Sequence, residues 1–141
     1  MSSLDWAALR QGGAVALVVA VPCSIAATWL GSQEDDSAWT ILFVLGALAG
    51  FTLGAGIAAW VQRTGYPLLH GIVCAGGTYL VAQAVFVTVR LARGDDVRWL
   101  AVLFNLTASV FAGVLGGGMG SALQKRGFVP STGRVQQGDT E

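Results

Sequence analysis

Four long stretches without an acidic residue, lysine or arginine dominate this sequence, and one histidine, His70, lies within them. They run from Gly12 to Leu30, Trp39 to Gln62, Pro67 to Val89 and Trp99 to Gln124. A helix needs about 20 apolar residues to cross the hydrocarbon core of a bilayer, so each stretch is long enough for one crossing. Only 11% of the 141 residues are charged, whereas soluble domains carry about 25%. The sequence therefore predicts an all-α bundle of four transmembrane helices.

The polar connectors divide the chain into five segments. These are a cytoplasmic lead-in (1–11), a first transmembrane hairpin (12–61), a turn (62–67), a second transmembrane hairpin (68–123) and a tail (124–141). The tail is polar and contains Gly, Pro and Ser, which predicts disorder. An apolar run after Arg10 is also typical of a signal peptide. We expect this first helix to be retained, because the internal repeat described below needs it as a partner.

The basic residues predict how the bundle is oriented. One side of the predicted membrane carries Arg10, Arg63, Lys125, Arg126 and Arg134. The other side carries Arg90, Arg93 and Arg98. Since Lys and Arg in short loops favour the cytoplasm, we expect both termini on the cytoplasmic side of the cell membrane, the inner membrane of a bacterium.

Two parts of the sequence repeat. The segment "LGAGIAAWVQRTGY" (53–66) aligns without gaps to "LGGGMGSALQKRGF" (115–128), at an offset of 62. The pattern Asp-Asp-x-x-Trp occurs at 35–39 and at 95–99, at an offset of 60. These matches predict a tandem duplication of a two-helix hairpin. A two-helix unit returns to its starting side, so both copies would insert alike around a pseudo-two-fold axis along the membrane normal.

The aspartate pairs precede two of the predicted helices, with a tryptophan three residues after each pair. The residues are Asp35, Asp36, Trp39, Asp95, Asp96 and Trp99. An aspartate before a helix can cap its free N–H groups, and indole is favoured at headgroup depth, so we predict helix caps and interface anchors. The alternative is a ring of carboxylates that attracts cations or binds Ca²⁺. Arg98 beside the second pair argues against that alternative, because it would neutralise the site.

Small residues recur every four positions in two of the predicted helices. The two stripes consist of Gly46, Gly50 and Gly54, and of Ala112, Gly116 and Gly120. Small residues at this spacing let helix backbones approach closely, which favours helix association in lipid. We therefore predict that both stripes are packing surfaces, and that helices 39–61 and 99–123 meet near the pseudo-axis.

Few polar side chains lie at membrane depth. Gln83 and Asn105 each lie about six residues from the non-cytoplasmic end of a helix, roughly 9 Å deep at 1.5 Å per residue. We predict a hydrogen bond between them across the second hairpin, and the alternative is a polar path for a substrate or ion. His70, the single histidine, is predicted to be a hydrogen-bonding anchor and not a proton relay.

No pattern in the sequence indicates catalysis. It contains no nucleophile–His–acid set, no metal-ligand cluster and no phosphate-binding loop, so we expect no enzyme activity, metal or cofactor. The net charge is zero, so no attraction to nucleic acid is expected. The expected partners are the lipid bilayer and either further copies of this chain or a larger membrane protein.

The composition also points to a group of organisms. One lysine against seven arginines, with abundant Ala, Gly and Val, is typical of a GC-rich bacterial genome such as that of an actinobacterium. The whole-chain pattern resembles small uncharacterised four-helix integral membrane proteins of such bacteria, a resemblance that implies location and no activity. We expect a non-enzymatic accessory or scaffold protein. The competing hypothesis is a small oligomeric channel or transporter with a polar path at Gln83 and Asn105.

Overall fold

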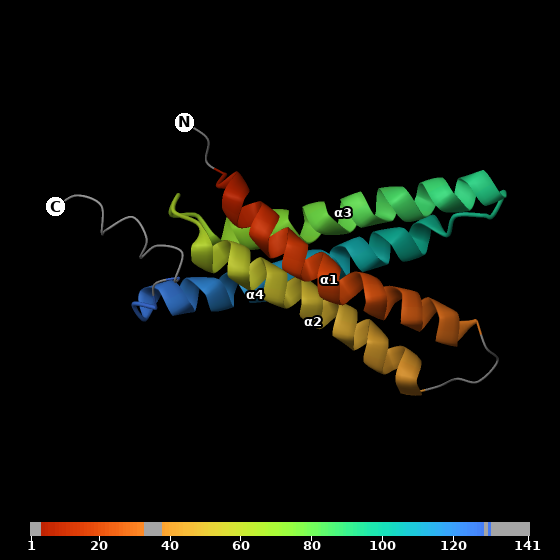
Figure 1. The fold of residues 1–141 in the computed structure, drawn as a ribbon, viewed down its shortest axis with the longest axis horizontal. Coiled ribbons are helices and arrows are strands. Elements are labelled where there is room, and N and C mark those ends of the chain that lie inside the picture. The colour runs from red at the N-terminus through yellow and green to blue at the C-terminus, as the bar shows by residue number, and fades with distance from the viewer. Residues whose placement is uncertain (1–3, 33–37, 129, 131–141) are drawn as a thin grey trace.

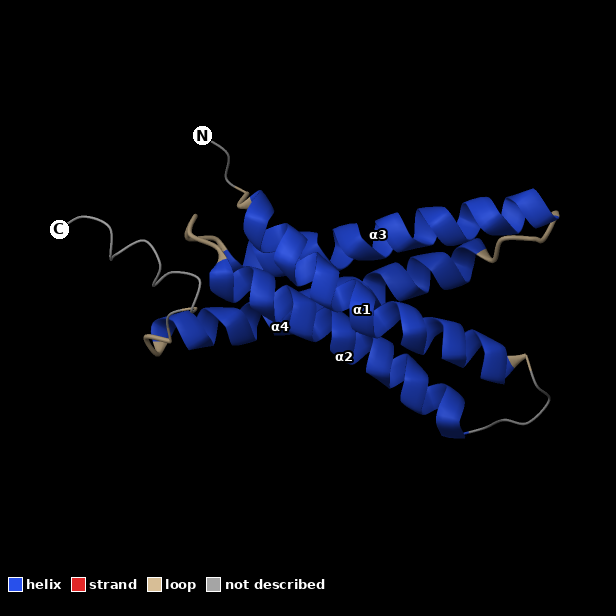
Figure 2. Ribbon diagram, in the orientation of Figure 1, coloured by secondary structure: helices blue, strands red, loops and turns tan. Residues whose placement is uncertain are grey.

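Four helices make up most of the computed structural model, which describes residues 4–32, 38–128 and 130 (Figures 1 and 2). They are α1 (Trp6–Gly31), α2 (Ala38–Val61), α3 (Pro67–Arg93) and α4 (Trp99–Lys125). All four are long and apolar enough to cross a membrane. The predicted class, an all-α chain with four candidate membrane spans, is therefore confirmed.

The starts of α1 and α3 follow from local sequence. The carboxylate of Asp5 accepts hydrogen bonds from the amides of Ala7 and Ala8, at 3.1 and 3.2 Å, and so caps the free N–H groups at the start of α1. Pro67 occupies the first position of α3. A backbone N–H at this position would have no acceptor within the helix, so proline, which lacks one, costs no hydrogen bond there. The first helix thus begins six residues earlier than the charge-free stretch that predicted it.

The ends of α3 and α4 share one conformation. Gly94 and Gly127 adopt φ angles of 77° and 79°, a left-handed conformation that is unfavourable for residues with a side chain. The amide of the next residue then turns back onto the helix: Asp95 N–H donates to Arg90 O at 3.0 Å. In α4, Phe128 N–H donates to Leu123 O at 3.2 Å. Glycine in this conformation is what closes both helices.

The helices form two antiparallel hairpins that cross (Figure 1). The start of α1, the turn between α2 and α3, and the end of α4 lie at one end of the bundle, which we call the terminal end. The hairpins diverge toward the other end, which carries the 94–98 connector and which we call the splayed end. In the middle, α2 packs on α1, α4 and α3, whereas α1 packs on α3 and does not approach α4.

Glycines bring the helix backbones into direct contact at three places. A Cβ atom added to Gly54 of α2 would lie 2.5 Å from the carbonyl oxygen of Gly12 in α1. A Cβ added to Gly71 of α3 would lie 2.5 Å from Gly113 O in α4. A Cβ on Gly120 of α4 would lie 2.5 Å from the carbonyl oxygen of Gly56 in α2. No side chain fits at these positions, so glycine sets the separation of all three helix pairs.

The predicted stripe on α2 faces α1. Gly50 packs on Val19 of α1, and Gly46 packs on Cys23 of the same helix. The two helices α2 and α4 do meet, but α2 contributes Gly56 and its neighbours, which lie on another face. Periodicity identifies residues that share a helix face, but it does not identify the helix that covers that face.

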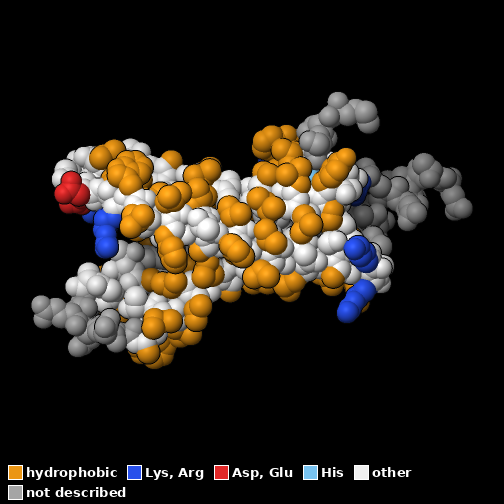
Figure 3. Space-filling view, turned by 180° about the vertical axis from the view of Figure 1, so that it is seen from behind, with side chains coloured by type: hydrophobic (Ala, Val, Ile, Leu, Met, Phe, Trp, Pro, Cys, Tyr) orange, Lys and Arg blue, Asp and Glu red, His pale blue; other side chains and the backbone are white. Residues whose placement is uncertain are grey.

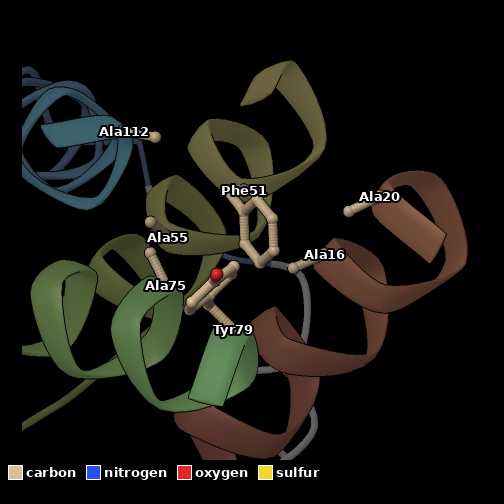
Figure 4. Close-up of a cluster of buried hydrophobic side chains, with 7 residues drawn as sticks. All are labelled: Ala16, Ala20, Phe51, Ala55, Ala75, Tyr79 and Ala112. Atoms are coloured by element: carbon tan, nitrogen blue, oxygen red, sulfur yellow. The ribbon is translucent and has the colours of Figure 1, made fainter. Parts of the chain in front are cut away.

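A cluster of five alanines and two aromatic side chains fills the centre, where all four helices contribute (Figure 4). Its members are Ala16, Ala20, Phe51, Ala55, Ala75, Tyr79 and Ala112. The rings of Phe51 and Tyr79 meet edge to face with centroids 6.3 Å apart, a favourable arrangement for aromatic pairs. The buried residues of α2 begin at Gly50, those of α4 begin at Ser109, and those of α3 end at Tyr79. On α1 the buried residues extend to Ala27, where α1 packs on α2, so it is the packing between the two hairpins that is concentrated in the terminal half.

Replacing Gly116 should destabilise the bundle more than replacing Gly118 on the same helix. A Cβ at Gly116 would lie 2.8 Å from Ala55 Cβ and 2.8 Å from Gly56 N, so the helices would have to separate. We expect Gly116→Ala to lower the free energy of unfolding by about 1–3 kcal/mol, measured as a lower melting temperature in detergent.

Gly118→Ala is the matched control, because nothing lies within 4 Å of a Cβ placed there. Alanine is also the better helix former, so this variant should melt at the same temperature or slightly higher. Equal destabilisation by the two variants would contradict the contact between α2 and α4.

Candidate functional site

Two glutamines that are 62 residues apart in sequence meet at the terminal end. Gln62, which is 4% exposed, donates from Nε2 to Gln124 Oε1 at 3.4 Å. Gln124 Nε2 donates in turn to the carbonyl oxygens of Trp60 at 2.9 Å and Gln62 at 3.2 Å. These bonds satisfy backbone carbonyls at the end of α2 that have no partner within the helix. The two amides therefore join the ends of α2 and α4.

Gln62 also shapes the turn between α2 and α3. Gln62 Oε1 accepts hydrogen bonds from Thr64 N at 2.8 Å, Thr64 Oγ1 at 3.0 Å and Gly65 N at 2.9 Å. Nearby, the indole Nε1 of Trp60 donates to Phe128 O at 2.8 Å. We call these five residues with Gln124 the amide cluster. Its amide groups bond to one another, to Thr64 and to local backbone, so the cluster joins the ends of α2 and α4 to the turn that follows α2.

His70 ties α3 to the start of α1. The side chain is fully buried. Its Nε2 lies 2.8 Å from the backbone N of Asp5, and its Nδ1 lies 2.8 Å from Tyr66 O. An amide donates and a carbonyl accepts, so Nε2 is the acceptor and Nδ1 carries the proton. The prediction of a hydrogen-bonding anchor is confirmed, because both ring nitrogens are held by backbone groups.

Of the two aspartate pairs predicted to cap helices, the structure describes the second, and this pair does not cap α4. Asp35 and Asp36 lie outside the described residues. The N-cap residue of α4 is Arg98, which makes no side-chain capping bond, so the prediction for Asp95 and Asp96 was wrong. The amide of Asp95 closes the end of α3 instead, and α4 begins too far along the chain for either carboxylate to cap it. Both aspartates are exposed.

The tryptophans that follow the aspartates lie near the splayed end, on the surface. Trp39 and Trp99 fall in the first turn of α2 and α4 and are 62% and 66% exposed. Their anchoring in a membrane interface stays a prediction.

Gln83 and Asn105 do not bond to each other. Gln83 is half-buried, Asn105 is exposed, and neither amide has a hydrogen-bond partner among the described residues. The two helices are antiparallel with Gly71 against Gly113, so Gln83, twelve residues beyond Gly71, lies level with Ala101. Asn105 is four residues away from that level, about 6 Å along the helix.

A tyrosine makes the bond that was expected of these amides. The phenol of Tyr79 donates to Val102 O at 2.9 Å and so links α3 to α4. Composition alone did not single out this residue. A tyrosine within an apolar run is the available signal, since a buried phenol needs an acceptor.

Asn105 shares a helix face with residues that contact α2. It lies eleven residues, about three turns, before Gly116, and Ser109 lies between them at two turns before Gly116. Gly116 touches α2 and Ser109 is buried, but Asn105 is exposed, because α2 has diverged from α4 at this height. Asn105 therefore lies on the face of α4 that contacts α2 nearer the terminal end, at a level where this face is exposed.

The surface separates apolar and charged side chains. Figure 3 shows hydrophobic side chains over the middle of the molecule and basic side chains at the terminal end. Acidic and basic side chains lie together at the splayed end. This distribution fits a protein whose middle contacts lipid and whose ends contact water.

The described part of the chain offers no metal site, because no three His, Cys, Asp or Glu residues come together there. A shallow hollow on α1, lined by Ala7, Arg10, Gln11 and Ala14, lacks such ligands too. Comparison of the chain with family models, curated proteins and solved structures gave no match.

Loss of Gln124 should destabilise the terminal end, whereas loss of Gln83 should not. In Gln124→Met, the carbonyls of Trp60 and Gln62 lose a donor, and we expect a loss of about 1–3 kcal/mol in unfolding free energy. Gln83→Met is the matched control, expected within about 0.5 kcal/mol of the parent. Chemical or thermal unfolding in detergent measures both, and similar losses would contradict the amide cluster.

Replacing His70 should loosen the start of α1. Cys74, one turn further along α3, is 3% exposed, and its Sγ lies 4.0 Å from Leu9 O in α1. In a Cys23→Ser background, we expect His70→Leu to raise the rate of maleimide labelling of Cys74 about tenfold, because the Asp5 amide loses its acceptor.

His70→Gln, which keeps a hydrogen-bond acceptor, should raise that rate less. If His70→Leu left labelling unchanged, the histidine would not hold α1 in place.

Proposed function

We propose that this chain is a multi-pass protein of the bacterial inner membrane without catalytic activity, which acts as an accessory or scaffold protein. The observation that carries this proposal is the closed middle of the bundle. Glycine and alanine backbones touch there, and the four-helix cluster around Phe51 and Tyr79 fills the remaining space. A polar path between the two ends would have to cross this cluster. The surface that stays available is the divergent splayed half.

The competing function is a channel or transporter, and Asn105 favours it. An amide at membrane depth without a partner is unusual, and such groups often line a polar path. In a single copy, a path from Asn105 toward the terminal end would meet the buried residues Ser109 and Ala112. Transport would therefore require a path between copies.

The orientation that we propose places both termini in the cytoplasm. The terminal end carries Arg10, Arg63, Lys125 and Arg126, and the splayed end carries Arg90, Arg93 and Arg98. The start of α1 and the end of α4 lie together at the terminal end, as four membrane crossings require (Figure 1). The larger number of basic residues supports a cytoplasmic terminal end.

We also propose that the two hairpins arose by tandem duplication, and repeated contacts support this. Each hairpin has a glycine on its first helix that touches a glycine on its second, at 12 and 54 and again at 71 and 113, a shift of 59 in both cases. The same shift relates the residues that pack around these glycines. The paired residues are Gly12 and Gly71, Ala16 and Ala75, Gly54 and Gly113, and Ala58 and Gly117.

The copies have diverged in their surroundings. The shift of 59 at the helix contact differs by three residues, nearly one turn, from the offset of 62 that aligns the terminal-end turns. In addition, α2 packs on α3, but α1 does not approach α4, although an exact two-fold axis would relate these pairs.

Purification from the native membrane tests the accessory role. Under mild detergent, we expect a tagged copy of this chain to bring down a larger membrane protein in a fixed ratio. Recovery of this chain alone, together with ion or solute flux when it is placed in liposomes, would contradict the accessory role and support the channel.

Reporter fusions test the orientation. An alkaline phosphatase fused to the C-terminus should be inactive, because the enzyme needs the periplasm. The same reporter inserted after Gly94, in the 94–98 connector, should be active. The reverse pattern would place the terminal end outside the cytoplasm.

A further inference from the structure

We propose that the splayed half of α4, from Trp99 to Ala108, is the contact surface for a second copy of this chain. In this dimer, Asn105 of one copy is hydrogen-bonded to Asn105 of the other across a two-fold axis along the membrane normal. The inference goes beyond the accessory role and rests only on the proposed placement in the membrane.

The first argument is the unmet hydrogen-bonding capacity of Asn105. Its amide is exposed, it has no partner among the described residues, and it lies within a candidate membrane span. Lipid tails offer neither donor nor acceptor, so an amide at this depth favours a bond to another helix. Within the chain, the helix that faces Asn105 is α2, and α2 has diverged there (Figure 1).

The second argument is that an amide is complementary to itself. Asn carries both a carbonyl acceptor and an NH₂ donor, so two copies related by a two-fold axis can satisfy each other. The face around Asn105 also permits a close approach. One turn to either side of it lie Ala101 and Ala108, whose small side chains let two helix backbones come together.

The third argument is charge at the splayed end. Arg93, Asp95, Asp96 and Arg98 are all exposed, and no ion pair links them within the described chain. A two-fold axis along the membrane normal brings the 94–98 connectors of both copies to the same side. Each connector carries both signs, so the arginines of one copy can face the aspartates of the other.

This charge pattern favours a second copy over lipid or an unrelated helix. Lipid tails cannot bond Asn105, and an unrelated partner would need its own hydrogen-bonding side chain at the same depth and charges of both signs at the same rim. A second copy supplies all of these by symmetry.

Disulfide cross-linking in membranes tests the surface. In a Cys23→Ser, Cys74→Ser background, Ala101→Cys places a thiol one turn from Asn105. We expect oxidation to give a cross-linked species of twice the chain mass. Val18→Cys is the control, because this position of α1 is 74% exposed and outside the proposed surface, so it should stay monomeric.

The role of the amide is tested in the same background. Adding Asn105→Leu should lower the dimer yield about fivefold, and Asn105→Gln should largely retain it, because glutamine keeps both donor and acceptor. Asn105 makes no bond within the monomer, so both variants should keep its melting temperature.

Three results would overturn the proposal. These are no dimer from Ala101→Cys although maleimide reaches the thiol, an unchanged dimer yield with Asn105→Leu, and a cross-linked species of another mass. The last would show that a different protein covers this face. Membrane placement is checked separately by retention of the chain in the pellet after alkaline carbonate extraction, so its failure is distinguishable from failure of the dimer.

Discussion

Direct contact between helix backbones is the constraint on which the rest of this structure depends. In lipid, apolar side chains gain little by meeting each other, so helices associate where their backbones pack closely. Three glycine contacts supply this packing, between α1 and α2, between α2 and α4, and between α3 and α4. All three lie in the terminal half or near the middle. Because nothing comparable joins the hairpins beyond Gly50 and Ser109, they diverge toward the splayed end.

This division assigns different roles to similar polar groups. At the terminal end, Gln62 and Gln124 lie where helices touch, and their amides satisfy backbone groups and each other. Asn105 lies where α2 has moved away, and its amide has no partner in the described chain. The amides of the terminal end therefore have partners within the chain, whereas the Asn105 amide in the splayed half has none in the described chain. This difference is the basis for proposing that a further chain packs on the splayed half.

Sequence reasoning was most accurate where the physical cause is local. The absence of charge over four stretches correctly predicted four helices long and apolar enough to span a membrane, because burying charge in lipid is costly whatever the neighbours are. It was less accurate where the neighbour matters. The stripe that includes Gly50 packs on α1, a neighbour that its periodicity did not identify, and Asp95 was assigned to the start of α4 when its amide ends α3. Gln83 and Asn105 were expected at similar depth, but they lie at levels of the hairpin that are four residues apart.

The sequence by itself determined the number of helices, their turns and the positions at which backbones can approach. Each of these depends on residues close together in the chain, such as Gly94 after α3 or the spacing of small residues in α4. Only the tertiary structure decided which faces meet, which polar groups find partners and where the hairpins part. Those outcomes depend on the register and crossing of helices that are distant in sequence, and a residue's own helix does not specify the height at which its partner will lie.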